Sequence, residues 1–235
     1  GQISTDLCHL RYLNIIDLSH NRLSGSLPPC IGGISFGYPT DDYDFWSRDY
    51  GMDINVGVGQ PDMDSSHLPL FSYAADYIRQ GFTFSTKGNV YTYSRSFFNL
   101  MFGIDLSANM LSGEIPREIG NLSHVKSLNL SHNFFIGQIP ATIANMSAIE
   151  SLDFSHNKLS GPIPWQMSQM SSLEVFSVAY NNLTGCIPNL GQFSSFSGDS
   201  YLGNTNLHNL SEGNKCSLTA GPMEVGDVDD ASDDL

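Results

Sequence analysis

Three histidines recur at one position of a repeated string. His20, His132 and His156 each follow a serine and precede an asparagine. We expect the last two on adjacent strands roughly 5 Å apart, close enough to share a metal ion or to titrate together. The string Leu-Ser-His-Asn is common at this kind of turn, and no third ligand is evident. The sequence therefore predicts no metal site and no cofactor.

Carboxylates recur in a second column. Asp17, Asp105 and Asp153 share one strand position, and paired carboxylates are the groups of acid–base catalysis. Asn129 interrupts the column and no pocket is indicated, so we expect a solvated polar face. The C-terminal EVGDVDDASDDL lacks the central glycine and closing glutamate of a calcium loop, and a disordered tether is expected there. We predict no catalytic residue and no enzyme.

These residues lie in a repeat. Leu106, Leu130, Phe154 and Val178 are 24 residues apart, each is followed by asparagine three residues later, and an earlier copy surrounds Leu18. In the consensus LxxLxLxxNxLxGxIPxxIGxL, alternating apolar residues predict a short strand whose inward side chains stack on the next coil. The asparagine turns the chain, and the glycine and Ile-Pro pair start the return segment. The sequence predicts an α/β-type repeat solenoid with parallel strands on its concave face and a 3-10 or irregular convex side.

An insert interrupts the repeat. Leu18 and Leu106 are 88 residues apart, one 24-residue step plus 64. We expect repeat sequence over 1–34, the insert over 35–97, four repeats over 98–193, a cap over 194–216 and an acidic tether over 217–235. The insert begins as an acidic loop, and its second half alternates as a β-hairpin would, with Gly88-Asn89 near the turn. It carries 14 of the 26 aromatic residues of the chain, which serve either as a recognition surface or in packing the insert onto the solenoid.

Composition indicates an extracellular protein. A net charge of −14 argues against a nucleic-acid partner, which needs a basic footprint. The cysteines are interpreted as two local disulfides, Cys8–Cys30 and Cys186–Cys216. No apolar run is long enough to span a bilayer, and we expect a fragment because the sequence begins in mid-pattern. Five glycosylation sequons point to the secretory route: Asn121, Asn129, Asn145, Asn182 and Asn209.

The chain resembles, over nearly its whole length, the ectodomain of plant leucine-rich-repeat receptor-like proteins. The repeat has the LSGxIP segment of the plant extracellular superhelix, and the insert lies four repeats before the end, as the island domain of that family does. Lys87 and Tyr93 match the family's Lys-x5-Tyr island motif, although Tyr77 is one residue too distant for the usual upstream tyrosine. Where family caps carry Leu-Cys-Gly this chain has Leu207-His208-Asn209, which puts the usual partner of Cys216 in doubt and leaves Cys186 as its replacement.

The resemblance implies a plasma-membrane receptor whose extracellular side binds a protein or peptide ligand and recruits a co-receptor of the somatic embryogenesis receptor kinase type. An adaptor kinase would act through a transmembrane helix beyond this chain. Lys87 and Tyr93 would support the co-receptor contact or the island's own fold. The exposed positions of the last two coils would form a docking strip: Asp153, Ser155, His156, Ser177, Ala179 and Tyr180. The alternatives are the ectodomain of a receptor kinase for a peptide hormone and a secreted inhibitor of a pathogen hydrolase.

Overall fold

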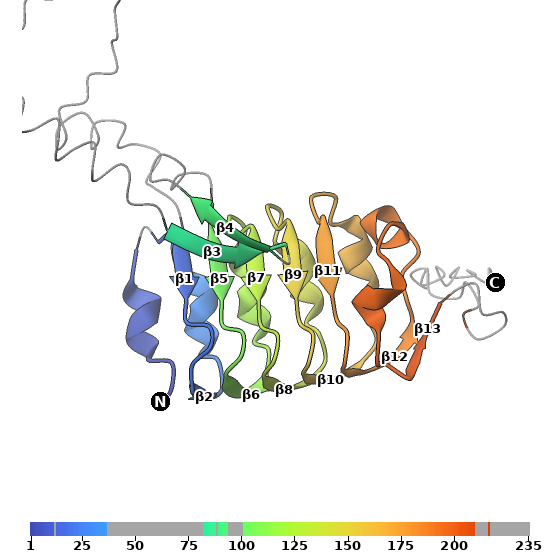
Figure 1. The fold of residues 1–235 in the computed structure, drawn as a ribbon, viewed down its shortest axis with the longest axis horizontal. Coiled ribbons are helices and arrows are strands. Elements are labelled where there is room, and N and C mark those ends of the chain that lie inside the picture. Colours follow the sequence, from blue (N-terminus) through green and yellow to red (C-terminus); the bar gives the residue numbers. More distant parts are fainter. Residues whose placement is uncertain (12, 37–81, 88, 94–100, 210–215, 217–235) are drawn as a thin grey trace, which may run out of the picture.

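The chain forms a row of stacked coils, seen in a computed structural model that describes residues 1–11, 13–36, 82–87, 89–93, 101–209 and 216. The acidic first half of the insert and the acidic tether lie outside the described residues. One strand of each coil joins a five-stranded parallel sheet in the order β1-β5-β7-β9-β11 (Figure 1). These strands are β1 (Ile15–Asp17), β5 (Gly103–Asp105), β7 (Ser127–Asn129), β9 (Ser151–Asp153) and β11 (Val175–Ser177). The predicted solenoid with its concave parallel sheet is confirmed.

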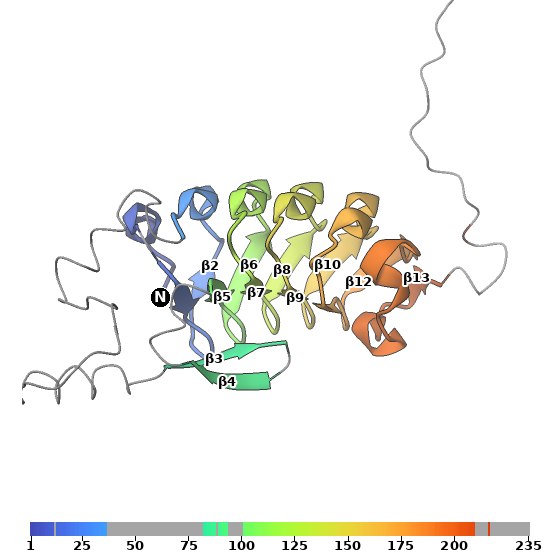
Figure 2. The same cartoon turned by 90° about the horizontal axis from the view of Figure 1, so that it is seen from above.

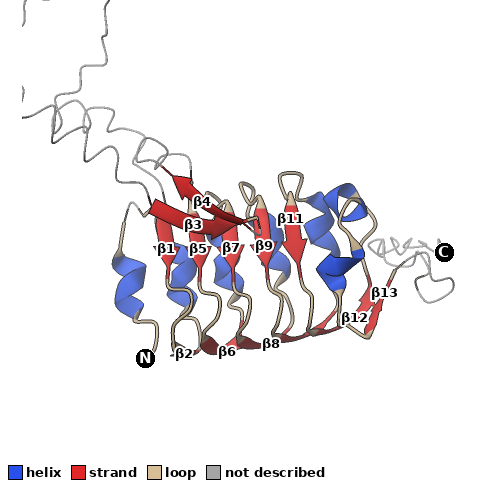
Figure 3. Cartoon of the chain, in the orientation of Figure 1, coloured by secondary structure: helices blue, strands red, loops and turns tan. Residues whose placement is uncertain are grey.

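A second parallel sheet, which the sequence did not predict, runs along another side of the coils in the order β13-β12-β10-β8-β6-β2 (Figure 2). Its strands are β2 (Ser24–Gly25), β6 (Met110–Glu114), β8 (Phe134–Gly137), β10 (Lys158–Gly161), β12 (Asn182–Cys186) and β13 (Asn206–His208). The return segments are short 3-10 helices on the side away from the first sheet (Figure 3). They are η2 (Pro29–Gly33), η5 (Arg117–Asn121), η6 (Ala141–Asn145) and η7 (Trp165–Gln169).

An asparagine ladder joins each coil to the next. The Nδ2 of Asn133 donates to the carbonyl oxygens of Leu106, Leu130 and Ser131 at 3.0, 3.2 and 3.1 Å. Its Oδ1 accepts a hydrogen bond from the Leu111 amide at 3.0 Å. Asn109, Asn157, Asn181 and Asn204 make corresponding bonds in their own coils. Every turn therefore satisfies backbone groups that the bend would otherwise leave unpaired.

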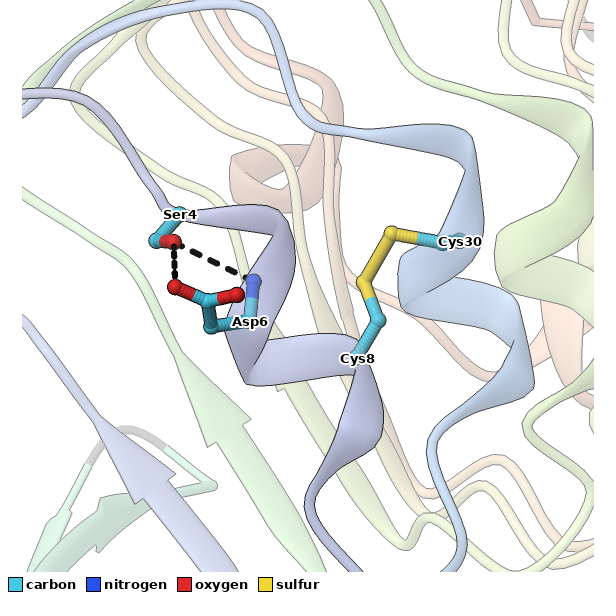
Figure 4. Close-up of a disulfide and its surroundings, with 4 residues drawn as sticks. All are labelled: Ser4, Asp6, Cys8 and Cys30. Carbon is cyan, nitrogen blue, oxygen red and sulfur yellow. Dashed lines mark hydrogen bonds between the residues drawn. A yellow bond between two sulfur atoms is a disulfide. The ribbon is translucent and has the colours of Figure 1, made fainter.

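A disulfide lies near each end of the row. Cys8–Cys30 joins η1 (Thr5–His9) to η2, and the Ser4 hydroxyl caps η1 by accepting a hydrogen bond from the Asp6 amide at 3.1 Å (Figure 4). Cys186–Cys216 ties β12 to the chain beyond β13. The last coil is covered by η8 (Gly191–Ser194) and η9 (Gly198–Tyr201), whose aromatic rings pack on Phe176. The apolar end of the solenoid is thereby closed.

The predicted hairpin is present in the insert. Strand β3 (Phe82–Thr86) pairs antiparallel with β4 (Asn89–Tyr93), with Phe82 opposite Tyr93 and Thr86 opposite Asn89. Lys87 lies in the turn with φ of 53°. Two strands alone are marginal in water, so the hairpin depends on a surface to pack against.

Candidate functional site

The hairpin lies across the concave sheet. Figure 1 shows β3 and β4 crossing the strands from β1 toward β9, while β11 remains beyond the tip, and Figure 2 shows the hairpin beside the same sheet. The hairpin thus divides the concave face into a covered part and an uncovered part on the last coil.

Three consecutive contacts fix the hairpin on the strands. The Phe84 ring, 1% exposed, packs over Gly103, where an added Cβ would lie 2.6 Å from two ring atoms. One coil further, the Thr86 hydroxyl donates to the Ser127 hydroxyl at 2.9 Å. On the next coil, the Lys87 amide donates to the Ser151 hydroxyl at 3.3 Å. Small residues at the first position of β5, β7 and β9 therefore let the hairpin approach closely.

The Lys87 ammonium group binds two glutamates of the solenoid. Its Nζ lies 2.6 Å from a carboxylate oxygen of Glu174 and 3.0 Å from one of Glu150, and Lys126 Nζ lies 3.0 Å from the other Glu150 oxygen. The hydrogen bond to Glu174 is the main cause that raises the pKa of Lys87, against the opposing effect of burial. Burial acts to raise the pKa of Glu150, but the Lys87 and Lys126 cations outweigh it and the pKa is lowered. These ion pairs hold the hairpin tip at the last two coils.

Lys87 therefore contributes to holding the hairpin on the solenoid, and the role in the island's own fold that the resemblance implied stays a prediction. Of Tyr93 the structure describes the strand position alone, opposite Phe82. A co-receptor contact by either residue stays a prediction.

The predicted docking strip is only partly exposed. Ser155 and Ala179 are buried, each 7% exposed, so the expectation that they face solvent is wrong. Both lie past the strand ends, where their backbone groups pair with the neighbouring coils. Asp153 and Ser177 are half-buried, His156 is exposed, and Tyr180 is 48% exposed. The accessible strip consists of Asp153, His156, Ser177 and Tyr180.

Three rings stack along this strip. The ring centroids of His132 and His156 are 4.1 Å apart with an interplanar angle of 12°, and those of His156 and Tyr180 are 4.4 Å apart at 20°. Burial and the nearby His132 lower the pKa of His156, whereas the Asp153 carboxylate acts to raise it. Among the residues that the structure describes, no group of three or more metal-ligating side chains could hold an ion.

The carboxylate column differs from the expected solvated face at its centre. Asp17 is exposed, but Asp105 is only 2% exposed. The Asp105 Oδ1 accepts a hydrogen bond from the backbone amide of Ser107 at 2.9 Å, and its Oδ2 accepts one from the Asn129 side-chain Nδ2 at 3.3 Å. Burial raises the pKa of Asp105, and the Asp17 charge adds to this. The column is a hydrogen-bonded part of the coil structure.

The five sequons differ in exposure. Asn129 is half-buried on the concave sheet, and both of its amide atoms are hydrogen-bonded. The other four asparagines are exposed, and glycosylation stays a prediction at all five positions: Asn121, Asn129, Asn145, Asn182 and Asn209.

Sequence reasoning missed the solenoid side of the hairpin contact. Phe84 and Thr86 were assigned only to a hairpin, and Glu150, Glu174 and Lys126 were not singled out. A usable signal existed in the residue before the central, inward-facing residue of each strand. It is glycine or serine in β5, β7 and β9, and valine in β11. A run of small residues on an exposed sheet position indicates a close approach by another segment.

No helix in the described part of the chain is long and apolar enough to cross a membrane.

Known proteins share the repeat sequence. Family models described as leucine-rich repeats match residues 9–34, 103–122 and 123–183. Receptor-like protein 45 of Arabidopsis thaliana is 42% identical over 127 residues, covering 52% of this chain and 13% of that protein. Receptor-like protein 9b of the same plant is 38% identical over 135 residues, covering 53% and 13%. The ectodomain of the Arabidopsis receptor kinase HAESA, solved with a peptide hormone ligand, has a TM-score of 0.49 and 26% identity, covering 89% of this chain and 28% of that one. The matched region is thus a small part of each receptor-like relative.

Proposed function

Because this chain carries leucine-rich repeats and is similar to plant receptor-like proteins, we propose that it is a ligand-binding ectodomain whose last coils recruit a co-receptor kinase. The co-receptor is of the somatic embryogenesis receptor kinase type. The ligand is an extracellular protein or peptide bound along the concave face and hairpin. The protein acts at the extracellular side of the plasma membrane, and an adaptor kinase joins it through a membrane-spanning segment outside this chain.

One observation carries the proposal: the hairpin is tied down at its tip and ends at β9. The Lys87 contacts with Ser151, Glu150 and Glu174 hold it there. The part of the strip on the last coil, Ser177 at the end of β11 and Tyr180 in the turn after it, stays open. A second protein at this place would touch the hairpin tip and the strip together. Its affinity would also depend on any ligand that shifts the hairpin.

Polar and aromatic groups equip the strip for protein contact. Tyr180 offers a partly exposed ring held by stacking on His156, and such pre-ordered aromatic side chains contribute contact area at low entropy cost. Asp153 and Ser177 add hydrogen-bonding groups at the centre of the strip. With a net charge of −14, the chain is unsuited to nucleic acid.

Binding of a co-receptor ectodomain to the immobilised chain tests the proposal, with and without extracellular extracts that contain candidate ligands. Ser177→Arg places a long side chain in the strip, and Ser112→Arg is the matched control, because it makes the same change at a half-buried position of the second sheet. We expect affinity to fall about tenfold or more in the first variant, as when the centre of an interface is blocked, and to be unchanged in the second. Equal affinities in both variants would exclude the strip.

Lys87→Ala and Tyr93→Ala test the hairpin in the same assay. A loss of co-receptor affinity in these variants, with Ser112→Arg unchanged, would assign the hairpin to the docking surface. Wild-type affinity in both variants would remove the hairpin from it and leave the strip alone as the contact.

A further inference from the structure

The His132–His156–Tyr180 stack is a structural unit distinct from the strand contacts around it. The three residues occupy one repeat position on consecutive coils. All have positive φ: 53° for His132, 52° for His156 and 55° for Tyr180. The asparagine ladder sets this backbone geometry at each turn. The rings are therefore brought face to face by the spacing of the coils.

His20 provides an internal comparison. It has the same repeat position and the same φ of 53°, but the next coil places Ala108 beside it. An alanine has no ring, so His20 lacks the face-to-face imidazole neighbour that His156 has. Any property that arises from stacking should be present at His156 and absent at His20.

We propose that the His132–His156–Tyr180 stack makes partner binding at the last coils sensitive to acid, because protonation of both imidazoles opens the stack. The location of the partner contact rests on the function proposed above. The stack holds Tyr180 and His156 in place while at least one imidazole is neutral. When both carry a proton, like charges lie face to face and the rings separate.

The geometry gives the size of the effect. Two unit charges about 4 Å apart repel enough, even with the full screening of water, to move the second protonation down by about 0.7 pH unit. The groups that face His156 are the His132 ring, the Tyr180 ring and the Asp153 carboxylate of its own coil. Burial and His132 outweigh Asp153, so the pKa of His156 lies below its ordinary value.

The sign follows from proton linkage. A histidine whose pKa is lower in the stacked state binds fewer protons there than in an open state. Acid therefore favours the open state, and the effect develops as pH falls below about 6.5, the ordinary histidine pKa. If the partner binds the stacked state only, affinity falls in acid by up to about fivefold in total, the factor that corresponds to a shift of about 0.7 pH unit.

The first test uses the chain without a partner. Imidazole Cε1–H chemical shifts are followed by NMR from acid to neutral pH in wild type, His132→Asn and His20→Asn. Asparagine tolerates positive φ, so the turn is preserved in both variants. We expect the midpoint of His156 to rise by about half a pH unit or more in His132→Asn and to stay unchanged in His20→Asn. An unchanged His156 midpoint in His132→Asn overturns the inference.

The second test measures co-receptor ectodomain affinity over the same pH range for the same three proteins. Titration of the co-receptor itself is common to all three and cancels in the comparison. We expect a loss of affinity in acid of up to about fivefold for wild type and His20→Asn and a smaller loss for His132→Asn. Identical pH profiles in all three, with binding intact, overturn the inference and leave the proposed function standing. Absence of binding at every pH refutes the proposed function, and with it the acid effect on binding.

Discussion

Gly103→Ala should release the hairpin from the concave face while leaving the coils folded. The new Cβ would lie 2.6 Å from the Cε1 and Cζ atoms of Phe84, so the ring must leave its place. Full burial of a phenylalanine is worth about 1.5–3 kcal/mol, and losing about 2 kcal/mol of it raises the opening equilibrium about 30-fold. Because the solenoid packs through other residues, its thermal unfolding should change little.

Hydrogen exchange measured by mass spectrometry reports this opening directly. Peptides covering Phe82–Thr86 should exchange about 30-fold faster in Gly103→Ala, whereas peptides from β8 and β10 should be unaffected. Gly33→Ala is the control, because that position has open space around it and no positive φ. Unchanged exchange of the hairpin in Gly103→Ala would show that Phe84 does not hold the hairpin at this place.

Three further predictions concern the ladder, the cap and the hairpin tip. Asn133→Ala should lower the free energy of unfolding, measured in urea, by about 2–4 kcal/mol, because the Leu111 amide and the Leu106 carbonyl lose their hydrogen-bond partner. The control Asn145→Ala, at an exposed position, should change it by less than about 0.5 kcal/mol. Tyr201→Phe should be neutral or slightly stabilising at pH 7, because the buried hydroxyl has no hydrogen-bond partner among the residues that the structure describes. Burial raises the pKa of Tyr201 to about 12, whereas the phenol of an unfolded chain ionises near pH 10. The free energy of unfolding of wild type, but not that of the variant, should therefore fall as pH rises above about 10. Lys87→Met should speed hairpin exchange about two- to fivefold, because partly exposed ion pairs contribute about 0.5–1 kcal/mol, and salt should affect the exchange of wild type more than that of the variant.

The spacing of residues was sufficient to predict the solenoid. A fixed 24-residue step places each inward residue on its copy, and Leu106, Leu130 and Phe154 indeed form one column of fully buried side chains. The second sheet was missed because its segments carry a glycine with positive φ, which is not typical of a strand: Gly113 lies inside β6 and Gly137 ends β8. The 24-residue repeat should nevertheless have indicated the second sheet. Any extended segment that recurs at each coil lies one strand spacing from its copy and can pair with it.

The candidate site was less accessible to prediction, because its contacts join distant parts of the chain. Lys87 meets Ser151 and Glu174 across 64 and 87 residues, and no local pattern specifies such a pair. Periodicity does indicate which positions share a column, but it does not give their exposure. Ser155 and Ala179 were placed in solvent for this reason, although the turn after the strand buries them.

The extent of the open strip follows from the lengths of the elements. Three residue steps from Phe84 to Lys87 cover about 10 Å in an extended strand, and two strand spacings from β5 to β9 also cover about 10 Å. The hairpin turn therefore falls at Ser151, where the contact is observed. Reaching β11 would need one or two more residues in each hairpin strand, and the first position there is Val175, whose side chain would oppose the close approach that glycine and serine allow. Both the length of the hairpin and the side chain at this position leave the last coil uncovered, so lengthening β3 and β4 by two residues each, together with Val175→Ser, should close the strip and abolish co-receptor binding without altering the solenoid.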